Sequence, residues 1–202
     1  MVIFDFDGTL ANSLPWFIGI MDEIGERFGG RKIDVAELPR LRKLGPGQIL
    51  TELGLPLWKL PVMVNYVRER MSGSAEAIPL FEGIEEVLVQ LVEKGAMIAV
   101  VSSNSEKNVR TVLGPEIAGL IRAYECGASI FGKATRFRRV LQRLGCTAAE
   151  GISIGDEIRD IDAAEEVGLA TGAVAWGYAD AEALRARGAG IIFEKPREIL
   201  LL

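Results

Sequence analysis

Two carboxylates follow the first apolar run of the chain. Asp5 and Asp7 stand two residues apart in the segment VIFDFDGTL (2–10), and Gly8 and Thr9 come directly after them. Burying a carboxylate without a partner carries a large free-energy penalty, so we expect positive charge nearby. One of two such acids can attack phosphorus as a nucleophile, and the other can donate a proton to the leaving oxygen.

Further polar side chains follow later apolar runs that are typical of buried strands. Ligands of open parallel sheets bind beyond the carboxyl ends of the strands. These clusters of polar residues are therefore predicted to meet at that edge of the sheet, which is called the rim below, although they are far apart in the sequence. The clusters are Ser102, Ser103 and Asn104 after residues 96–101, Asp156 and Asp160 after residues 151–155, and Lys133 before a helical pattern at 134–144.

The predicted rim holds more negative than positive charge. Asp5, Asp7, Asp156 and Asp160 would face Lys133 alone, and crowded carboxylates repel one another and any anionic substrate. Mg²⁺ prefers carboxylate, water and phosphate oxygens as ligands. The sequence therefore predicts Mg²⁺ among these acids, which would make the rim nearly neutral and able to admit a phosphate.

A phosphoryl group at this rim needs hydrogen-bond donors. Ser102 and the backbone N–H groups after it would hold its oxygens at a helix N-terminus. Simpler alternatives are open: Ser102 to Asn104 could merely cap that helix, and Asp160 could merely complement a helix dipole. The residues predicted to contact substrate are Gly8, Thr9, Ser103 and Asn104.

Composition excludes several classes of function. The 202 residues contain no histidine, which rules out a Ser-His-Asp triad and any histidine base or metal ligand. A net charge of −5 argues against nucleic acid as a partner, and no apolar run is long enough to predict a membrane span. Cys126 and Cys146 are too few for a disulfide framework, which is consistent with a reducing cytoplasm. A small molecule is the expected partner.

Apolar runs alternate with helical patterns over most of the chain. This alternation predicts an α/β fold with a parallel, Rossmann-like sheet covered by helices on both faces. Strands are predicted at 2–6, 96–101, 151–155 and 170–176, with weaker candidates at 123–127 and 190–193. Helices are predicted at 83–94, 105–113, 134–144, 159–167 and 180–187.

Residues 15–78, called here the helical insertion, break the alternation. They carry helical patterns at 15–28, 47–53 and 57–71 and no convincing strand. We expect a small helical cap, hinged near 12–15 and 77–79, on an α/β core of residues 1–14 and 79–202. Arg40, Arg42 and Lys43 could meet a substrate carboxylate, although such charge runs usually face water.

Some side chains are expected to have no role in catalysis or binding. Glu157, Asp162 and Glu165 are expected on a solvated helix face. Trp16, Trp58 and Trp176 are expected to pack in the core or the cap rather than to bind substrate.

Four segments together resemble the motifs of the haloacid dehalogenase-like superfamily. They are DFDGTL at 5–10, VVSSN at 100–104, GK at 132–133 and GDEIRDIDAA at 155–164, and the resemblance extends to VAWG at 174–177. The insertion resembles the helical cap of the phosphoglycolate phosphatase-like branch.

This resemblance implies roles for the motif residues. Asp5 would be the nucleophile and Asp7 the general acid and base, with Ser102 on the phosphoryl group and Lys133 balancing charge. Mg²⁺ would bind Asp5, the Asp7 carbonyl and Asp156, supported by Asp160. The sequence departs from the family where KATR follows in place of KPxP at Lys133, and where Asn12 replaces a usual aspartate.

The expected function is a Mg²⁺-dependent phosphatase for a small phosphomonoester, such as phosphoglycolate or a sugar phosphate. A phosphosugar mutase would keep the same motifs, whereas a dehalogenase usually lacks the second acid, Asp7. A non-catalytic phosphate-sensing protein on this fold is a third alternative, although it would not need the nucleophile Asp5. Oligomeric state is not predicted.

Overall fold

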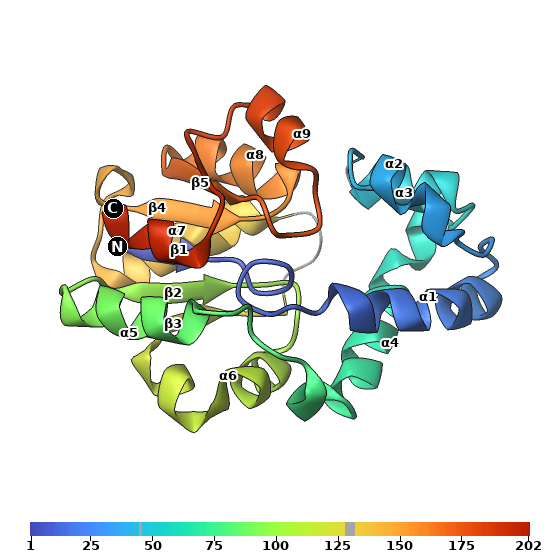
Figure 1. The fold of residues 1–202 in the computed structure, drawn as a ribbon, viewed down its shortest axis with the longest axis horizontal. Coiled ribbons are helices and arrows are strands. Elements are labelled where there is room, and N and C mark those ends of the chain that lie inside the picture. The colour runs from blue at the N-terminus through green and yellow to red at the C-terminus, as the bar shows by residue number, and fades with distance from the viewer. Residues whose placement is uncertain (45, 128–131) are drawn as a thin grey trace.

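A parallel six-stranded sheet forms the centre of the α/β core. A computed structural model describes residues 1–44, 46–127 and 132–202. The strand order is β3-β2-β1-β4-β5-β6, and neighbouring strands run parallel (Figure 1). This confirms the predicted fold class and its six strands. The strands are β1 (Val2–Phe4), β2 (Ile98–Val101), β3 (Ala123–Glu125), β4 (Ile152–Gly155), β5 (Ala170–Val174) and β6 (Ile191–Phe193).

The alternation of side chains along β1 explains its uninterrupted apolar run. Val2 and Phe4 pack into a cluster with helices α5 (Ile84–Glu93) and α6 (Glu106–Leu120) on one face of the sheet. Ile3 packs on the other face with α7 (Lys133–Leu144) and α8 (Ile158–Val167). A strand buried on both faces must be apolar at every position, because successive side chains point to opposite sides.

The helices of the core lie where the sequence predicts them, with one difference. The helix predicted at 105–113 ends where expected, at a break at Gly114 whose φ is 70°, but a second helical segment that was not predicted follows to Leu120 and is included in α6. Pro115 follows the break, and proline fits the first turn of a helix because its missing N–H is not needed there. The last α-helix of the core is α9 (Ala181–Arg187), and the core also has 3₁₀ helices at Ala148–Glu150 and Pro196–Leu201.

The helical insertion lies beyond the carboxyl ends of the strands, to the right of the arrowheads in Figure 1. Its described residues form helices and no strand, around an apolar cluster of their own that includes Ile24, Leu53 and Met63. No helix in the described part of the chain is long and apolar enough to cross a membrane. The α-helices of the insertion are α1 (Leu14–Phe28), α2 (Leu38–Leu41), α3 (Pro46–Glu52) and α4 (Leu60–Ser72). Its 3₁₀ turns are Val35–Glu37, Leu57–Lys59 and Ala75–Ala77.

The three tryptophans have different environments. Trp16 and Trp176 pack against the core cluster, as expected. The expectation for Trp58 was wrong, because its surface is 78% exposed. Trp58 lies in the 3₁₀ turn before α4, outside the apolar face of that helix, and its ring lies 5.3 Å from the Lys59 ammonium.

Two chain segments that lie side by side in space connect the insertion to the core. The Asn12 N–H donates to the Pro79 carbonyl at 2.9 Å, and the Phe81 N–H donates to the Leu10 carbonyl at 2.9 Å. The entering and leaving segments therefore pair in an antiparallel way, as the bridge between Ala11 and Leu80 also shows. Both lie at the positions where hinges are predicted.

Arg42 makes a second connection between insertion and core. Its guanidinium donates to the carbonyls of Gly177 and Tyr178, each at 2.9 Å. The Asp180 N–H donates in turn to the Arg42 carbonyl at 2.9 Å. Arg42 thus holds the insertion against the loop that follows β5.

We expect Arg42→Ala to loosen the loop at 177–180. Losing two hydrogen bonds of about 1 kcal/mol each should speed hydrogen exchange at the Tyr178 and Asp180 amides by roughly tenfold or more, measured by NMR. Arg40→Ala is the matched control, since Arg40 bonds to Glu52 within the insertion at 2.8 Å. Equal exchange rates in both variants would contradict this role of Arg42.

Candidate active site

Asp5 and Lys133 form a buried ion pair at the end of β1. Asp5 is 4% exposed, and its Oδ2 lies 3.0 Å from the Lys133 ammonium. Burial raises the pKa of Asp5, and the charge of Lys133 partly offsets that rise. Burial also acts against the charge of Lys133, yet Asp160 and Asp5 hold its pKa above the ordinary value. The fold therefore brings the predicted lysine onto the predicted nucleophile.

Three carboxylates meet beside this pair. Single oxygens of Asp5, Asp156 and Asp160 lie within 4.8 Å of one another, and all three residues are buried. Asp160 Oδ1 contacts Lys133, and its Oδ2 accepts the N–H groups of Asp156 at 3.1 Å and Glu157 at 3.0 Å. Burial opposes ionisation of Asp160, but Lys133 and Arg159 hold its pKa below the ordinary value. Asp160 is thus an anchor for the β4–α8 turn, while Asp5 and Asp156 face a possible cation.

Asp156 is held from two sides by backbone that approaches closely. Its Oδ1 accepts the Thr9 hydroxyl at 3.0 Å, and its Oδ2 accepts the Tyr178 N–H at 2.7 Å. A Cβ atom at Gly8, where φ is 80°, would lie 2.2 Å from Asp156 Oδ2. A Cβ atom at Gly177 would lie 2.1 Å from the Asp156 Cβ. Burial and the charge of Glu157 raise the pKa of Asp156 well above its ordinary value, so its ionised form needs a positive charge nearby.

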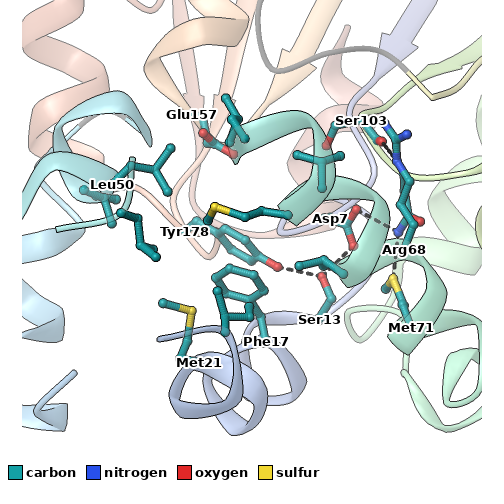
Figure 2. Close-up of a pocket in the computed structure, with 18 of the residues that line it drawn as sticks. Asp7, Ser13, Phe17, Met21, Leu50, Arg68, Met71, Ser103, Glu157 and Tyr178 are labelled. Carbon is teal, nitrogen blue, oxygen red and sulfur yellow. Dashed lines mark hydrogen bonds between the residues drawn. The ribbon is translucent and has the colours of Figure 1, made fainter. Parts of the chain in front are cut away.

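Asp7 faces a pocket rather than the cluster of three acids. Its Oδ1 accepts the Ser13 hydroxyl at 2.9 Å, and its Oδ2 accepts the Asn104 amide at 3.1 Å (Figure 2). The Ser13 and Tyr178 hydroxyls are 2.8 Å apart, so a short chain of hydroxyls leads to Asp7. Burial raises the pKa of Asp7 to about 6, in the range where a carboxyl can both donate and accept a proton.

The segment after β2 is shaped by hydrogen bonds of its own. Ser102 Oγ accepts the Asn104 N–H at 3.0 Å, and the Ser103 carbonyl accepts the Arg68 guanidinium at 2.6 Å. The helix cap of α6 is Ser105, whose side chain accepts the Asn108 N–H. The capping alternative for residues 102–104 was therefore wrong. The Ser105 N–H donates to Asn104 Oδ1 at 2.8 Å, so the N–H groups of Asn104 and Ser105 both have partners within this turn.

The prediction that Glu157 lies on a solvated helix face was also wrong. Its side chain is only 14% exposed and lines the pocket, where it pairs with Arg159 at 2.7 Å. Glu157 is the N-cap of α8, so it points back over the rim instead of outward. Asp162 and Glu165 lie on the solvated face, as expected, and pair with Arg187.

Several residues of the site carried no functional assignment from the sequence. Position within a recognised motif is the one signal that could have found Arg159, which lies inside GDEIRD. Ser13, Arg68 and Tyr178 offered no such signal, because their approach to the rim depends on the packing of distant segments. All four line the pocket.

The pocket lies between the rim and the helical insertion and has a volume of about 250 Å³. Its charged lining residues are Asp7, Arg68, Glu157 and Arg159, and most of the remaining lining is apolar. Asp5 is not among the lining residues, so the pocket begins on the Asp7 side of the site.

The three neighbouring cations Arg40, Arg42 and Lys43 do not gather at the pocket. Arg40 pairs with Glu52 and Arg42 with backbone carbonyls of the core, while Lys43 is exposed. None of them is a lining residue. Their suggested contact with a substrate carboxylate thus finds no support in this arrangement.

Comparisons with known proteins agree with this geometry. The profile of the haloacid dehalogenase-like hydrolases matches residues 2–174. A phosphoglycolate phosphatase from Synechococcus elongatus is 32% identical over 98% of this chain and 94% of its own. An N-acetylmuramic acid 6-phosphate phosphatase from Pseudomonas aeruginosa is 26% identical over 98% of this chain and 92% of its own. A haloacid dehalogenase-like hydrolase from Streptococcus pneumoniae shares the fold, with a TM-score of 0.81 at 20% identity over 99% and 96% of the two chains.

The close approach at Asp156 generates a prediction. We expect Gly177→Ala to lower the free energy of unfolding by about 1–3 kcal/mol, because its Cβ would displace Asp156. Gly119→Ala is the control, since no atom lies within 4 Å of a Cβ built there. Urea denaturation measures both, and equal midpoints would show that Asp156 is not confined by Gly177.

Proposed function

The chain belongs to the haloacid dehalogenase-like hydrolases and is a phosphatase of that family; we propose that it uses Mg²⁺ and an aspartyl-phosphate on Asp5 to hydrolyse a small phosphomonoester. The observation that carries this proposal is the buried contact of Asp5 with Lys133 beside Asp156 and Asp160. Relatives that act on phosphoglycolate and on a sugar phosphate support the substrate class.

The acidic cluster fits a hard divalent cation. Asp5 and Asp156 would supply carboxylate oxygens, with the Asp7 carbonyl as a third ligand and Asp160 in support through the turn that it anchors. Burial and mutual repulsion disfavour the charged forms of Asp5 and Asp156, and a cation removes that penalty. When bound, Mg²⁺ would neutralise charge on the phosphoryl oxygens and orient them.

Asp5 acts as the nucleophile. A carboxylate oxygen of Asp5 attacks phosphorus while the bond from phosphorus to the leaving alcohol breaks, which gives an aspartyl-phosphate and the alcohol. The positive charge of Lys133 favours the ionised form of Asp5, which this attack needs. The Ser102 hydroxyl and the Ser103 N–H hold the phosphoryl oxygens, with further contacts from Gly8, Thr9 and Asn104.

Asp7 moves the protons. In the first step its carboxyl donates a proton to the oxygen of the leaving alcohol. In the second step the Asp7 carboxylate takes a proton from water, whose oxygen attacks phosphorus and releases phosphate and free Asp5. A pKa of about 6 suits both steps, and the hydrogen bonds from Ser13 and Asn104 orient the carboxyl.

The helical insertion at 15–78 serves as a cap that closes over the rim. The paired segments at Asn12 and Pro79 are the proposed hinge, and Arg42 is a contact that holds the cap on the loop after β5. Closure would exclude water during the first step and select the leaving group.

We expect Asp5→Asn to abolish turnover of phosphomonoesters, with a fall in kcat of at least about 1,000-fold, because the amide is a poor nucleophile. Phosphate release measures this, and acid quenching of the parent with a ³²P-labelled ester should trap label on Asp5. The control is Asp162→Asn, on the solvated face of α8. Label without phosphate release would indicate a mutase, and activity in Asp5→Asn would exclude the mechanism.

We also expect millimolar Mg²⁺ to raise the melting temperature of the parent, because binding to the folded state alone stabilises it. Asp156→Asn should lose at least half of that rise, whereas Asp162→Asn should retain it. Calorimetry with and without a chelator gives the comparison. An identical rise in both variants would show that Mg²⁺ does not use Asp156.

A further inference from the structure

The pocket between rim and insertion lies where a leaving group must go. Asp7 lines it, whereas Asp5 and Lys133 do not, so the cavity extends from the proton donor and away from the nucleophile. In an in-line displacement the leaving oxygen lies opposite the attacking oxygen and within reach of the acid. The group attached to that oxygen would therefore enter this cavity.

The walls of the cavity are apolar where they leave the rim. Phe17 and Met21 come from α1, Leu50 from α3, and Val64 from α4. Figure 2 shows Leu50 and Met21 on the far side of the pocket from Asp7, with Phe17 and Tyr178 between them. The Phe17 and Tyr178 rings stack with centroids 6.4 Å apart, which places a flat apolar wall beside the path from Asp7.

The charges in the lining lie near the rim and are largely paired there, although the buried Nε of Arg159 has no hydrogen-bond partner among the described residues. Glu157 pairs with Arg159 at 2.7 Å. Arg68 donates to the Ser103 carbonyl at 2.6 Å and to Asn65 at 3.2 Å. A carboxylate pushed past them among the apolar walls would lose its water without gaining a cation, which is strongly unfavourable.

We infer that the cavity takes the uncharged, apolar leaving group of an alkyl or aryl phosphomonoester. This inference rests on the proposed function and narrows it, because it favours such esters over phosphoglycolate and sugar phosphates. A volume of about 250 Å³ gives room for a group much larger than one water molecule. Burial of that group among the walls supplies the binding free energy.

The first test uses the parent protein with Mg²⁺ and a series of straight-chain alkyl phosphates from methyl to hexyl. We expect kcat/KM to rise by about fourfold per methylene until the cavity is full, the factor given by ~0.8 kcal/mol for each buried CH₂. Isobutyl phosphate should exceed phosphoglycolate by at least about tenfold, because the two leaving groups differ mainly in charge. A flat series, or a preference for phosphoglycolate, would overturn the inference while leaving phosphatase activity intact.

A matched pair of variants tests the location. Val64 lines the cavity, whereas Val62 on the same helix is 61% exposed and does not. Val64→Trp should lower the ratio of kcat/KM for hexyl over methyl phosphate by at least about tenfold, since the indole fills the space. Val62→Trp should keep the ratio of the parent, and thermal melts establish that both variants fold. Equal ratios in the two variants would place the apolar site elsewhere.

Measurements of phosphonate binding test the apolar cavity without requiring the proposed catalytic mechanism. Methylphosphonate and hexylphosphonate are not hydrolysed, and calorimetry gives their Kd values in the presence of Mg²⁺. Tighter binding of the hexyl compound that Val64→Trp removes would support the cavity even if no ester were turned over. Equal Kd values for the two phosphonates, together with no turnover, would overturn both proposals.

Discussion

The buried charge at the end of β1 is the constraint on which the rest of the site depends. Asp5, Asp156 and Asp160 lie within 4.8 Å of one another, and Lys133 is the cation in direct contact with two of them. Such a group of acids is tolerable inside a protein only when cations and hydrogen bonds compensate it. The compensation comes from segments more than a hundred residues apart, so the cluster can form only when the sheet is assembled. It then gives one carboxylate the surroundings of a nucleophile.

The site also requires that the backbone approach Asp156 closely. Asp156 reaches the rim because Gly8 and Gly177 leave no Cβ in its way, and Thr9 and Tyr178 then fix its two oxygens. The loop that supplies Tyr178 also receives Arg42 from the insertion. The position of the insertion and the position of Asp156 are thus linked through one short loop, which connects closure of the cap to the proposed cation site.

The two acids of the first motif have separate surroundings although they are two residues apart. Asp5 points toward Lys133 and the other acids, whereas Asp7 points toward Ser13, Asn104 and the pocket. Asp5 thus lies beside a positive charge that favours its ionised form, whereas burial raises the pKa of Asp7 to about 6. The proposed division between attack and proton transfer rests on this separation, and so does the proposed direction in which the leaving group departs.

The sequence by itself determined the fold class, the six strands and which acids and lysine meet at the rim. Apolar periodicity reports burial directly, and residues that follow parallel strands must meet at one edge of the sheet. Tertiary structure alone decided which side chains complete the site. Glu157 was expected on a solvated face, yet its N-cap position turns it over the pocket, and Tyr178 and Arg68 reach the site by packing of distant segments. Local sequence patterns show which face of a helix or strand is apolar. Which other segment packs on that face depends on contacts between residues far apart in the chain.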